Sequence, residues 1–260
     1  MAALTTVLFD FDGTLSTLRA GWEEVMAPYM KEVIKGNAEL TQEEESALDQ
    51  EIGDYIDEST GIQTVYQMRW LAEEVRRKGW NPQVLDEWEY KAEYNRRLLL
   101  RVKRKVELLE QGRLQAEDFL MKGSVEFLNL LRDRGIEMYV ASGTDHPDVV
   151  REAEVLGVAG YFKRIVGAPV GKAECSKEKV IFDLMENQGL SGRQLAVVGD
   201  GKVEIGLAKR RGSLALGLAS DERNREGIDA RKRARLEKAG ADWIAGDFRK
   251  PEQWLSAMGL

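Results

Sequence analysis

Two acidic side chains stand two positions apart at the end of an apolar run near the start of the chain. The stretch is VLFDFDGTLS, residues 7–16, in which Asp10 and Asp12 precede Gly-Thr. Residues two apart in a strand point to the same side, so the two carboxylates lie together while Phe9 and Phe11 point the other way. Two like charges this close need a cation, and Mg²⁺ prefers carboxylate and water oxygens. An ordinary Asp-containing turn is the alternative for this stretch taken alone.

Polar and acidic residues also follow two later apolar runs. The run YVASGT ends on Ser142, Gly143 and Thr144, where a small residue lets backbone amides approach an oxyanion. The run LAVVGD ends on Asp200, and Glu204 follows within reach of the same site if a helical turn forms. Each stretch alone is common as a turn or polar loop. Because the carboxyl ends of parallel strands share one edge of a sheet, their convergence predicts one site there.

The elements that must position these residues follow from the apolar pattern. Residues 5–9 have the composition of a buried strand, and 16–120 carry only helical signals. From residue 123 onward, apolar runs alternate with amphipathic segments, which predicts a parallel sheet with helices on both faces. The predicted helices of the intervening block are at about 20–35, 42–58, 63–78 and 82–110; the later strands are at 136–142, 163–167, 195–200 and 214–218, with helices at 123–135, 146–157, 176–189 and 203–212.

Composition limits the class of protein and the kind of metal site. The 260 residues are 43% apolar with a formal charge of −7, which is typical of a globular chain and argues against binding to nucleic acid or to an anionic membrane. No leader segment or membrane-length apolar run is visible, so we expect a cytoplasmic protein, monomeric or homodimeric. With only Cys175 and His146 available, a bound metal would be held by oxygen. The basic stretch at 229–240 is predicted to be an exposed helix face.

This ordered set of motifs resembles the haloacid dehalogenase superfamily, in its phosphatase branch with an α-helical C1-type cap. The matching motifs are DFDGT at 10–14, VASGT at 140–144 and GDGKVE at 199–204. The resemblance implies a Rossmann-like α/β core at 1–15 and 121–260 and a helical cap domain at 16–120. It also implies a Mg²⁺ cofactor and an aspartyl-phosphate intermediate.

The resemblance implies a role for each motif residue. Asp10 is the expected nucleophile, and Asp12 the expected general acid and base. A lysine of the third motif should precede Asp200 by about two dozen residues at the start of a helix. Lys177 fits, 23 positions earlier and after a possible N-cap residue, Ser176, whereas Lys172 is the reserve candidate and Lys179 would point elsewhere. The expected phosphate or substrate ligands are Ser142, Gly143, Thr144 and Arg19, and the expected metal ligands are Asp10, Asp12 through its carbonyl, Asp200 and Glu204.

The function implied is hydrolysis of a small phosphorylated metabolite, a phosphate monoester such as a sugar phosphate. A sugar phosphomutase of the same superfamily is an alternative that the sequence does not separate from it. A catalytically silent binding module is a third possibility, although a binder would not need both Asp10 and Asp12. A dehalogenase is disfavoured because that branch lacks the second aspartate.

Overall fold

The computed structural model describes residues 3–260, which divide into two compact units. The first unit combines the N-terminal residues up to Ala20 with Lys105–Leu260, and the second is the continuous segment Gly21–Arg104. The segments 16–20 and 105–120 therefore group with the first unit. Among the described residues, no helix is both long enough and apolar enough to cross a membrane.

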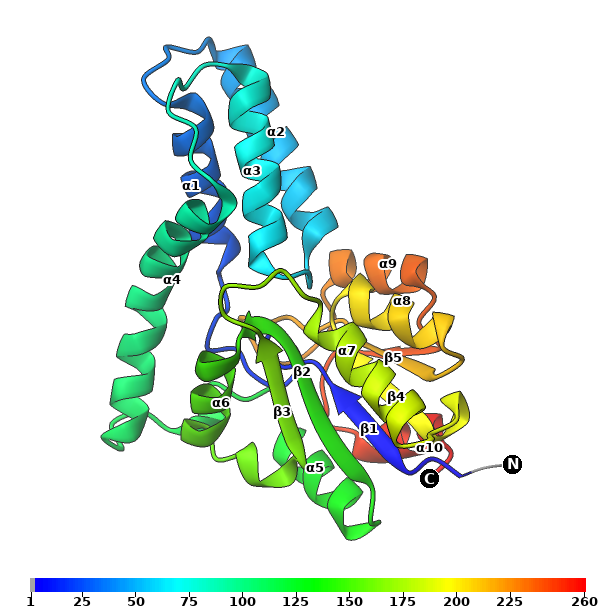
Figure 1. Cartoon of the computed structure of the whole chain (residues 1–260). Coiled ribbons are helices and arrows are strands. Elements are labelled where there is room, and N and C mark those ends of the chain that lie inside the picture. The colour runs from blue at the N-terminus through cyan, green and yellow to red at the C-terminus, as the bar shows by residue number, and fades with distance from the viewer. Residues whose placement is uncertain (1–2) are drawn as a thin grey trace. The chain divides into compact units, whose positions relative to one another are not determined.

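The first unit is built on a six-stranded sheet in the order β3-β2-β1-β4-β5-β6, and every neighbouring pair is parallel (Figure 1). The first strand therefore lies in the middle, between β2 and β4. This arrangement confirms the predicted parallel α/β core. The strands are β1 (Thr6–Phe9), β2 (Glu137–Asp145), β3 (Arg164–Ala168), β4 (Leu195–Gly199), β5 (Leu214–Leu218) and β6 (Trp243–Ala245).

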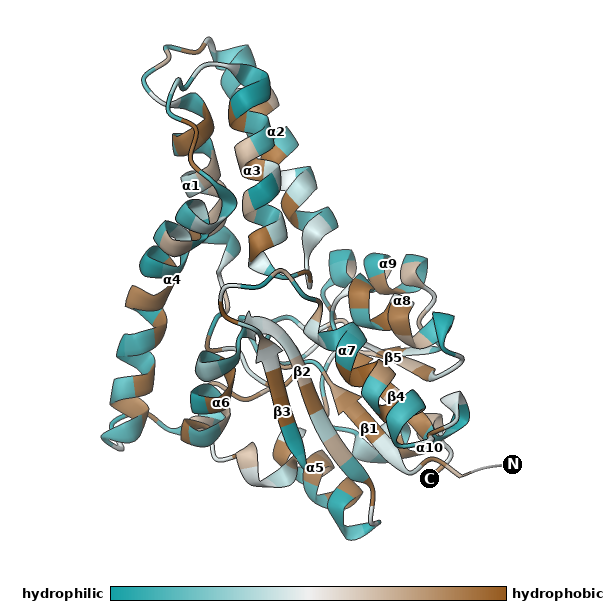
Figure 2. Ribbon diagram, in the orientation of Figure 1, coloured by the Kyte–Doolittle hydropathy of each residue, from teal (hydrophilic) through white to brown (hydrophobic). Residues whose placement is uncertain are grey.

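Both faces of the sheet are covered, which explains why the central strands are apolar without alternation (Figure 2). On one face Leu8 belongs to a cluster with Val180, Ile205 and Leu236, which come from α7, α8 and α9. On the other face Phe9 packs edge-on against Phe127 of α5. The helices of this unit are α5 (Ser124–Asp133), α6 (His146–Val155), α7 (Ser176–Phe182) with a π-helical turn at Asp183–Asn187, α8 (Lys202–Arg210), α9 (Ala230–Ala239) and α10 (Pro251–Met258).

The second unit is helical, and its helices begin and end where local signals stand. The Thr41 hydroxyl accepts a hydrogen bond from the backbone N–H of Glu44, and the Glu44 carboxylate accepts one from that of Thr41, which fixes the start of α2. Gly79, in the left-handed conformation, ends α3. The helices are α1 (Glu23–Lys35), α2 (Gln42–Ser59), α3 (Thr64–Lys78) and α4 (Glu87–Glu110), whose residues from Lys105 onward belong to the first unit.

Candidate active site

The first motif turns immediately after β1. Asp10 donates its backbone N–H to the carbonyl of Val198 on β4, at 2.8 Å, so it still follows the sheet. The chain then folds back, because the Phe11 carbonyl accepts the backbone N–H groups of Leu15 and Ser16. Phe11 is fully buried and anchors this turn, which leaves the two aspartates beyond the carboxyl end of the central strand.

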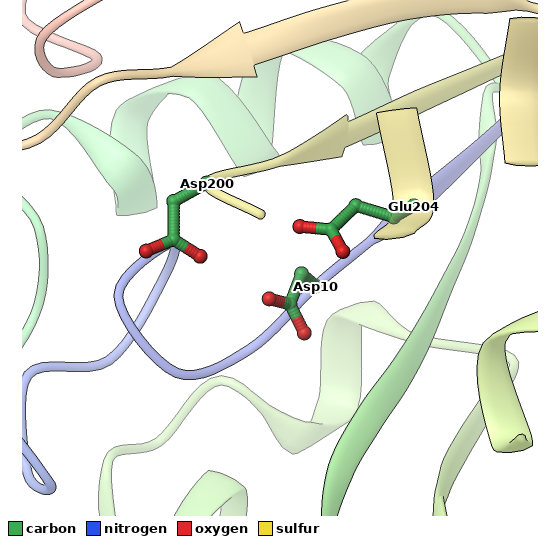
Figure 3. Close-up of side chains that lie close together, drawn as sticks. All are labelled: Asp10, Asp200 and Glu204. Atoms are coloured by element: carbon green, nitrogen blue, oxygen red, sulfur yellow. The ribbon is translucent and has the colours of Figure 1, made fainter. Parts of the chain in front are cut away.

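Three buried carboxylates meet at this edge of the sheet. One oxygen each of Asp10, Asp200 and Glu204 lies within 4.8 Å of the others, and the three side chains lie close together in Figure 3. They come from the end of β1, the end of β4 and the first turn of α8. The Glu204 carboxylate is held in place by Oε1, which accepts the backbone N–H of Gly201 at 2.6 Å. The structure thus brings together three of the residues predicted to bind metal.

Lys177 lies between two of these carboxylates. Its Nζ is 3.1 Å from Oδ1 of Asp10 and 2.8 Å from Oε2 of Glu204, and only 3% of the side chain is exposed. Lys172 is exposed, and Lys179 is exposed and pairs with Glu174. Of the three lysines weighed from the sequence, the structure therefore places Lys177 against Asp10.

The local reason for the position of Lys177 differs from the prediction. The N-cap of α7 is Cys175, and Ser176 is the first helical residue, so the expectation that Ser176 caps the helix was wrong. The Ser176 hydroxyl instead donates to the carbonyl of Ser142 at 2.5 Å. This bond ties the start of α7 to the end of β2 and fixes Lys177 beside the cluster.

Burial and charge shift the ionisation of this cluster. Burial raises the pKa of Asp10 well above its usual value, against the opposing effect of Lys177. Burial alone would lower the pKa of Lys177, but the charges of Asp10 and Glu204 outweigh it and raise that pKa. Burial would also raise the pKa of Asp200, yet Lys232 holds it below its usual value. Without a metal, the carboxyl group of Asp10 is thus less readily ionised than that of Asp200.

Asp12 has a different set of partners. Its Oδ2 accepts hydrogen bonds from the hydroxyls of Ser142, at 3.1 Å, and Thr144, at 2.8 Å. These residues and Gly143 are the last part of β2, where the register with β3 shifts between Ala141 and Asp145. Such an irregularity re-aims side chains at the end of a strand. The other oxygen of Asp12, Oδ1, is buried and accepts no hydrogen bond within residues 3–260.

Arg19 faces acidic groups of α6. Its Nη2 is 2.6 Å from Oε1 of Glu152 and 3.4 Å from Asp148, while its Nε is 3.8 Å from Oδ1 of Asp12. Burial would lower the pKa of Arg19, but Glu152 outweighs this and raises it. Burial raises the pKa of Glu152 to about 7, although Arg19 opposes that shift. The structure therefore places Arg19, which we expected to contact substrate, as a link between α6 and Asp12.

A second lysine at the site, mostly but not fully buried, was not predicted from the sequence. Lys232 of α9 has its Nζ 2.7 Å from Oδ2 of Asp200 and 2.6 Å from Oε1 of Glu222, with 13% of its side chain exposed. Another residue of α9, Arg235, donates to the backbone carbonyl of Asp200 at 3.3 Å. The prediction of an exposed basic helix face was therefore wrong for Lys232. The sequence feature that could have indicated the inward position of Lys232 is helical spacing, because Lys232, Arg235 and Leu236 share one side of α9.

The donor set fits a hard divalent cation. The cluster holds more acidic than basic side chains, and carboxylate oxygens suit Mg²⁺. Within residues 3–260, His146 is not among the residues whose ligand atoms gather at this cluster, and its Nδ1 accepts the backbone N–H of Gly167 at 3.2 Å. Four carboxylates stand against two ammonium groups and, when all are ionised, leave two negative charges for a cation to balance: Asp10, Asp200, Glu204 and Glu222 against Lys177 and Lys232.

This geometry agrees with the family to which the sequence is similar. The model of the haloacid dehalogenase-like hydrolases matches residues 4–212, which is most of the chain. The chain belongs to this family. The match contains the Asp10, Ser142, Lys177 and Asp200 segments and ends before α9, so Lys232 lies outside it.

Individual relatives of the family agree on the fold. A predicted phosphoglycolate phosphatase from Haemophilus somnus aligns with a TM-score of 0.64 at 16% identity, covering 98% of this chain and 99% of that one. A β-phosphoglucomutase from Clostridium difficile aligns with a TM-score of 0.65 at 13% identity, covering 98% and 97%. At such identities the likeness shows the haloacid dehalogenase-like fold alone.

One curated relative is similar over a short region. The 3-deoxy-D-manno-octulosonate 8-phosphate phosphatase KdsC of Haemophilus influenzae is 35% identical over 78 residues, which are 30% of this chain. The match spans 38% of the length of that relative.

Proposed function

We propose that the protein is a Mg²⁺-dependent phosphatase that hydrolyses a small phosphate monoester through a phosphorylated Asp10. The observation that carries the proposal is the placement of Asp10 between the ammonium group of Lys177 and the carboxylate of Asp200, next to Asp12. A nucleophile, a fixed positive charge and a metal-binding acid at one strand end are the parts that phosphoryl transfer needs.

Asp10 and Asp12 divide the chemistry between them. The Asp10 carboxylate attacks phosphorus, and the bond to the leaving oxygen breaks as the new O–P bond forms. Asp12 gives a proton to that oxygen, then takes one from the water that attacks the phosphoryl group and regenerates Asp10. Oδ1 of Asp12, which accepts no hydrogen bond within the described residues and lies 3.8 Å from Nε of Arg19, is the atom suited to this transfer, because Ser142 and Thr144 already hold Oδ2.

Positive charge and hydroxyl groups stabilise the transferring phosphoryl group in this proposal. Lys177 is buried and remains charged, so it offsets the repulsion between the Asp10 carboxylate and an anionic phosphate. One of the two hydroxyls, of Ser142 or of Thr144, can turn toward a phosphate oxygen while the other still donates to Oδ2 of Asp12. Asp10 and Asp200 would hold Mg²⁺ directly, and Glu204 would complete the site or hold Lys177 in place. When bound, Mg²⁺ supplies neutralisation of the phosphate charge.

The helical unit, Gly21–Arg104, is proposed to be the cap that selects the leaving group. This assignment rests on its insertion between the first motif and the rest of the sheet domain. The name of the curated relative describes a sugar-acid phosphate as the substrate of that protein, which makes sugar phosphates and sugar-acid phosphates the first compounds to test.

The test is phosphate release from a panel of phosphorylated metabolites, with and without Mg²⁺. The wild type is compared with Asp10→Asn, which keeps the size of the side chain and removes the nucleophile. Asp133→Asn, an exposed aspartate at the end of α5, is the matched control. We expect release that requires both Mg²⁺ and Asp10, with the control equal to the wild type. Full turnover by Asp10→Asn would refute the mechanism. Transfer of phosphate to a second sugar hydroxyl without release would make the protein a mutase.

A further inference from the structure

We propose that the ammonium group of Lys232 forms an ion pair with one carboxylate oxygen of Asp200 and that Lys232 and Glu222 together set the affinity of the site for Mg²⁺. This inference rests on the proposed Mg²⁺-dependent function and goes beyond it, because Lys232 lies outside the matched family region. Lys232 would be a positioning residue, which acts on the metal site through Asp200.

The hydrogen bonds of Lys232 explain why it positions Asp200 and does not bind substrate. An ammonium group has three donors, and Nζ has three acceptors: Oδ2 of Asp200 at 2.7 Å, Oε1 of Glu222 at 2.6 Å and Oγ of Ser220 at 3.2 Å. No donor remains for a phosphate oxygen. Oδ2 of Asp200 is thereby taken. Within residues 3–260, Oδ1 accepts one hydrogen bond, a long one of 3.5 Å from the Thr14 hydroxyl, so Oδ1 is the oxygen open to a metal.

The network is anchored so that the lysine cannot easily move away. The Ser220 hydroxyl accepts from Lys232 and donates its own proton to the carbonyl of Gly13, at 2.7 Å. Gly13 belongs to the first motif and has a positive φ of 73°. A Cβ at this position would collide with the Asp200 carboxylate and come within 3.0 Å of Glu222. The turn of the first motif therefore packs directly against the pair formed by Asp200 and Lys232.

Charge determines the sign of the effect. A positive charge on an oxygen of Asp200 competes with Mg²⁺ for the same carboxylate and repels the ion. Glu222 works in the opposite direction, because it shares the ammonium group with Asp200 and adds a negative charge nearby. Removing the lysine should therefore tighten Mg²⁺ binding, and neutralising the glutamate should weaken it.

The experiment measures Mg²⁺ binding itself by isothermal titration calorimetry, with thermal unfolding in parallel. The variants are Lys232→Met and Glu222→Gln, and the matched control is Lys238→Met, an exposed lysine on the same helix. For Lys232→Met we expect the Kd of Mg²⁺ to fall by roughly tenfold or more, and for Glu222→Gln we expect it to rise several-fold. The control should bind Mg²⁺ as the wild type does.

Thermal unfolding separates this role from a structural one. Lys232→Met should lower the Tm of the metal-free protein, because two buried carboxylates lose their counter-charge, yet increase the rise in Tm that Mg²⁺ produces. Lys232→Gln, which can still donate hydrogen bonds, is the second variant if the methionine variant does not fold. If the role of Lys232 were purely structural, the Lys232 and Glu222 variants would all bind Mg²⁺ more weakly than the wild type. That result, or an unchanged Kd in both Lys232→Met and Glu222→Gln, would overturn the inference.

The outcome is distinguishable from failure of the proposed function. If the wild type does not bind Mg²⁺, or if Asp200→Asn still binds it, the proposed metal-dependent function is wrong. The inference about Lys232 is then wrong as well. If the wild type binds Mg²⁺ through Asp200 but Lys232→Met does not bind it more tightly, only the inference is wrong.

Discussion

The Nζ atom of Lys177 lies 3.1 Å from Oδ1 of Asp10, and both side chains are almost completely buried. In a buried ion pair, removal of one partner leaves the other charge without compensation, which costs more than the pair contributes. Lys177 pairs with both Asp10 and Glu204, so its removal would leave two buried carboxylates without this counter-charge. It also distinguishes Lys177 from the other lysines of its segment.

Replacement of Lys177 is expected to destabilise the metal-free protein. Lys177→Met should lower the free energy of unfolding by about 3–5 kcal/mol, since two buried carboxylates lose their partner. Lys172→Met, at an exposed position, should change it by less than about 0.5 kcal/mol. Urea unfolding in the presence of a chelator measures both. Equal, small losses would mean that Lys177 carries no buried charge pair.

Asp12 should matter most where the leaving group is poor. Asp12→Asn removes the proposed proton donor, so turnover of an alkyl phosphate should fall by about 10²- to 10⁴-fold. With p-nitrophenyl phosphate, whose leaving group needs no proton, phosphorylation of Asp10 should stay fast and only the later attack of water should slow. A stopped-flow burst of nitrophenolate followed by slow turnover is the expected result. Loss of the burst would assign Asp12 a role other than acid catalysis.

A side chain at Gly13 would be unfavourable for two reasons, the positive φ and the close contact with Asp200. Comparison with a second glycine of similar φ separates the two effects. Gly13→Ala places a side chain at positive φ and drives it against the Asp200 carboxylate. Gly135→Ala has nearly the same φ, 72°, with no atom within 4 Å of the added Cβ. The second change should cost about 1 kcal/mol of unfolding free energy. Gly13→Ala should cost more and also reduce phosphate release, whereas equal effects on both quantities would contradict the close packing described above.

The raised pKa of Glu152 is expected to make the stability of the protein depend on pH. Its pKa is about 7 in the folded protein against an ordinary 4.5, so between these values the folded state binds more protons than the unfolded state. Stability is therefore lost as pH rises from about 4.5 to 7, by about 3 kcal/mol from this group. Unfolding free energies across this range should fall in the wild type and fall less in Glu152→Gln. Identical slopes in the two proteins would show that Glu152 is ionised throughout.

Much of the sheet, and the gathering of acidic residues at one of its edges, could be predicted from the sequence. The apolar run ending at Asp10 is the central strand, and the helices of the inserted block begin and end within a few residues of the predicted positions. These elements follow from local signals, such as the capping residues around Thr41 and Gly79. The acidic residues at strand ends could be combined because a parallel sheet brings those ends to one edge.

The contacts of long side chains could not be predicted. The sequence ARKRARLEKA offers five basic residues, and only the packing of α9 on the sheet shows that Lys232 points inward. Arg19 was expected at the substrate, but its partners lie on α6, more than a hundred positions away in the chain, and no local pattern connects the two. Ser176 was expected to cap a helix because serine is a favoured N-cap residue, whereas the tertiary hydrogen bond to Ser142 takes its hydroxyl.

The middle position of β1 has a consequence for how the protein folds during synthesis. Thr6 pairs with Glu137 on one side and with Leu195 on the other, so the strand that leads to Asp10 leaves the ribosome long before either neighbour exists. Contacts between such distant segments form slowly, because the long loop between them must close first. Until then the apolar TVLF segment needs protection from aggregation. The edge of the sheet where Asp10, Asp200 and Glu204 meet is therefore among the last parts of the molecule to assemble, after β4 has been made.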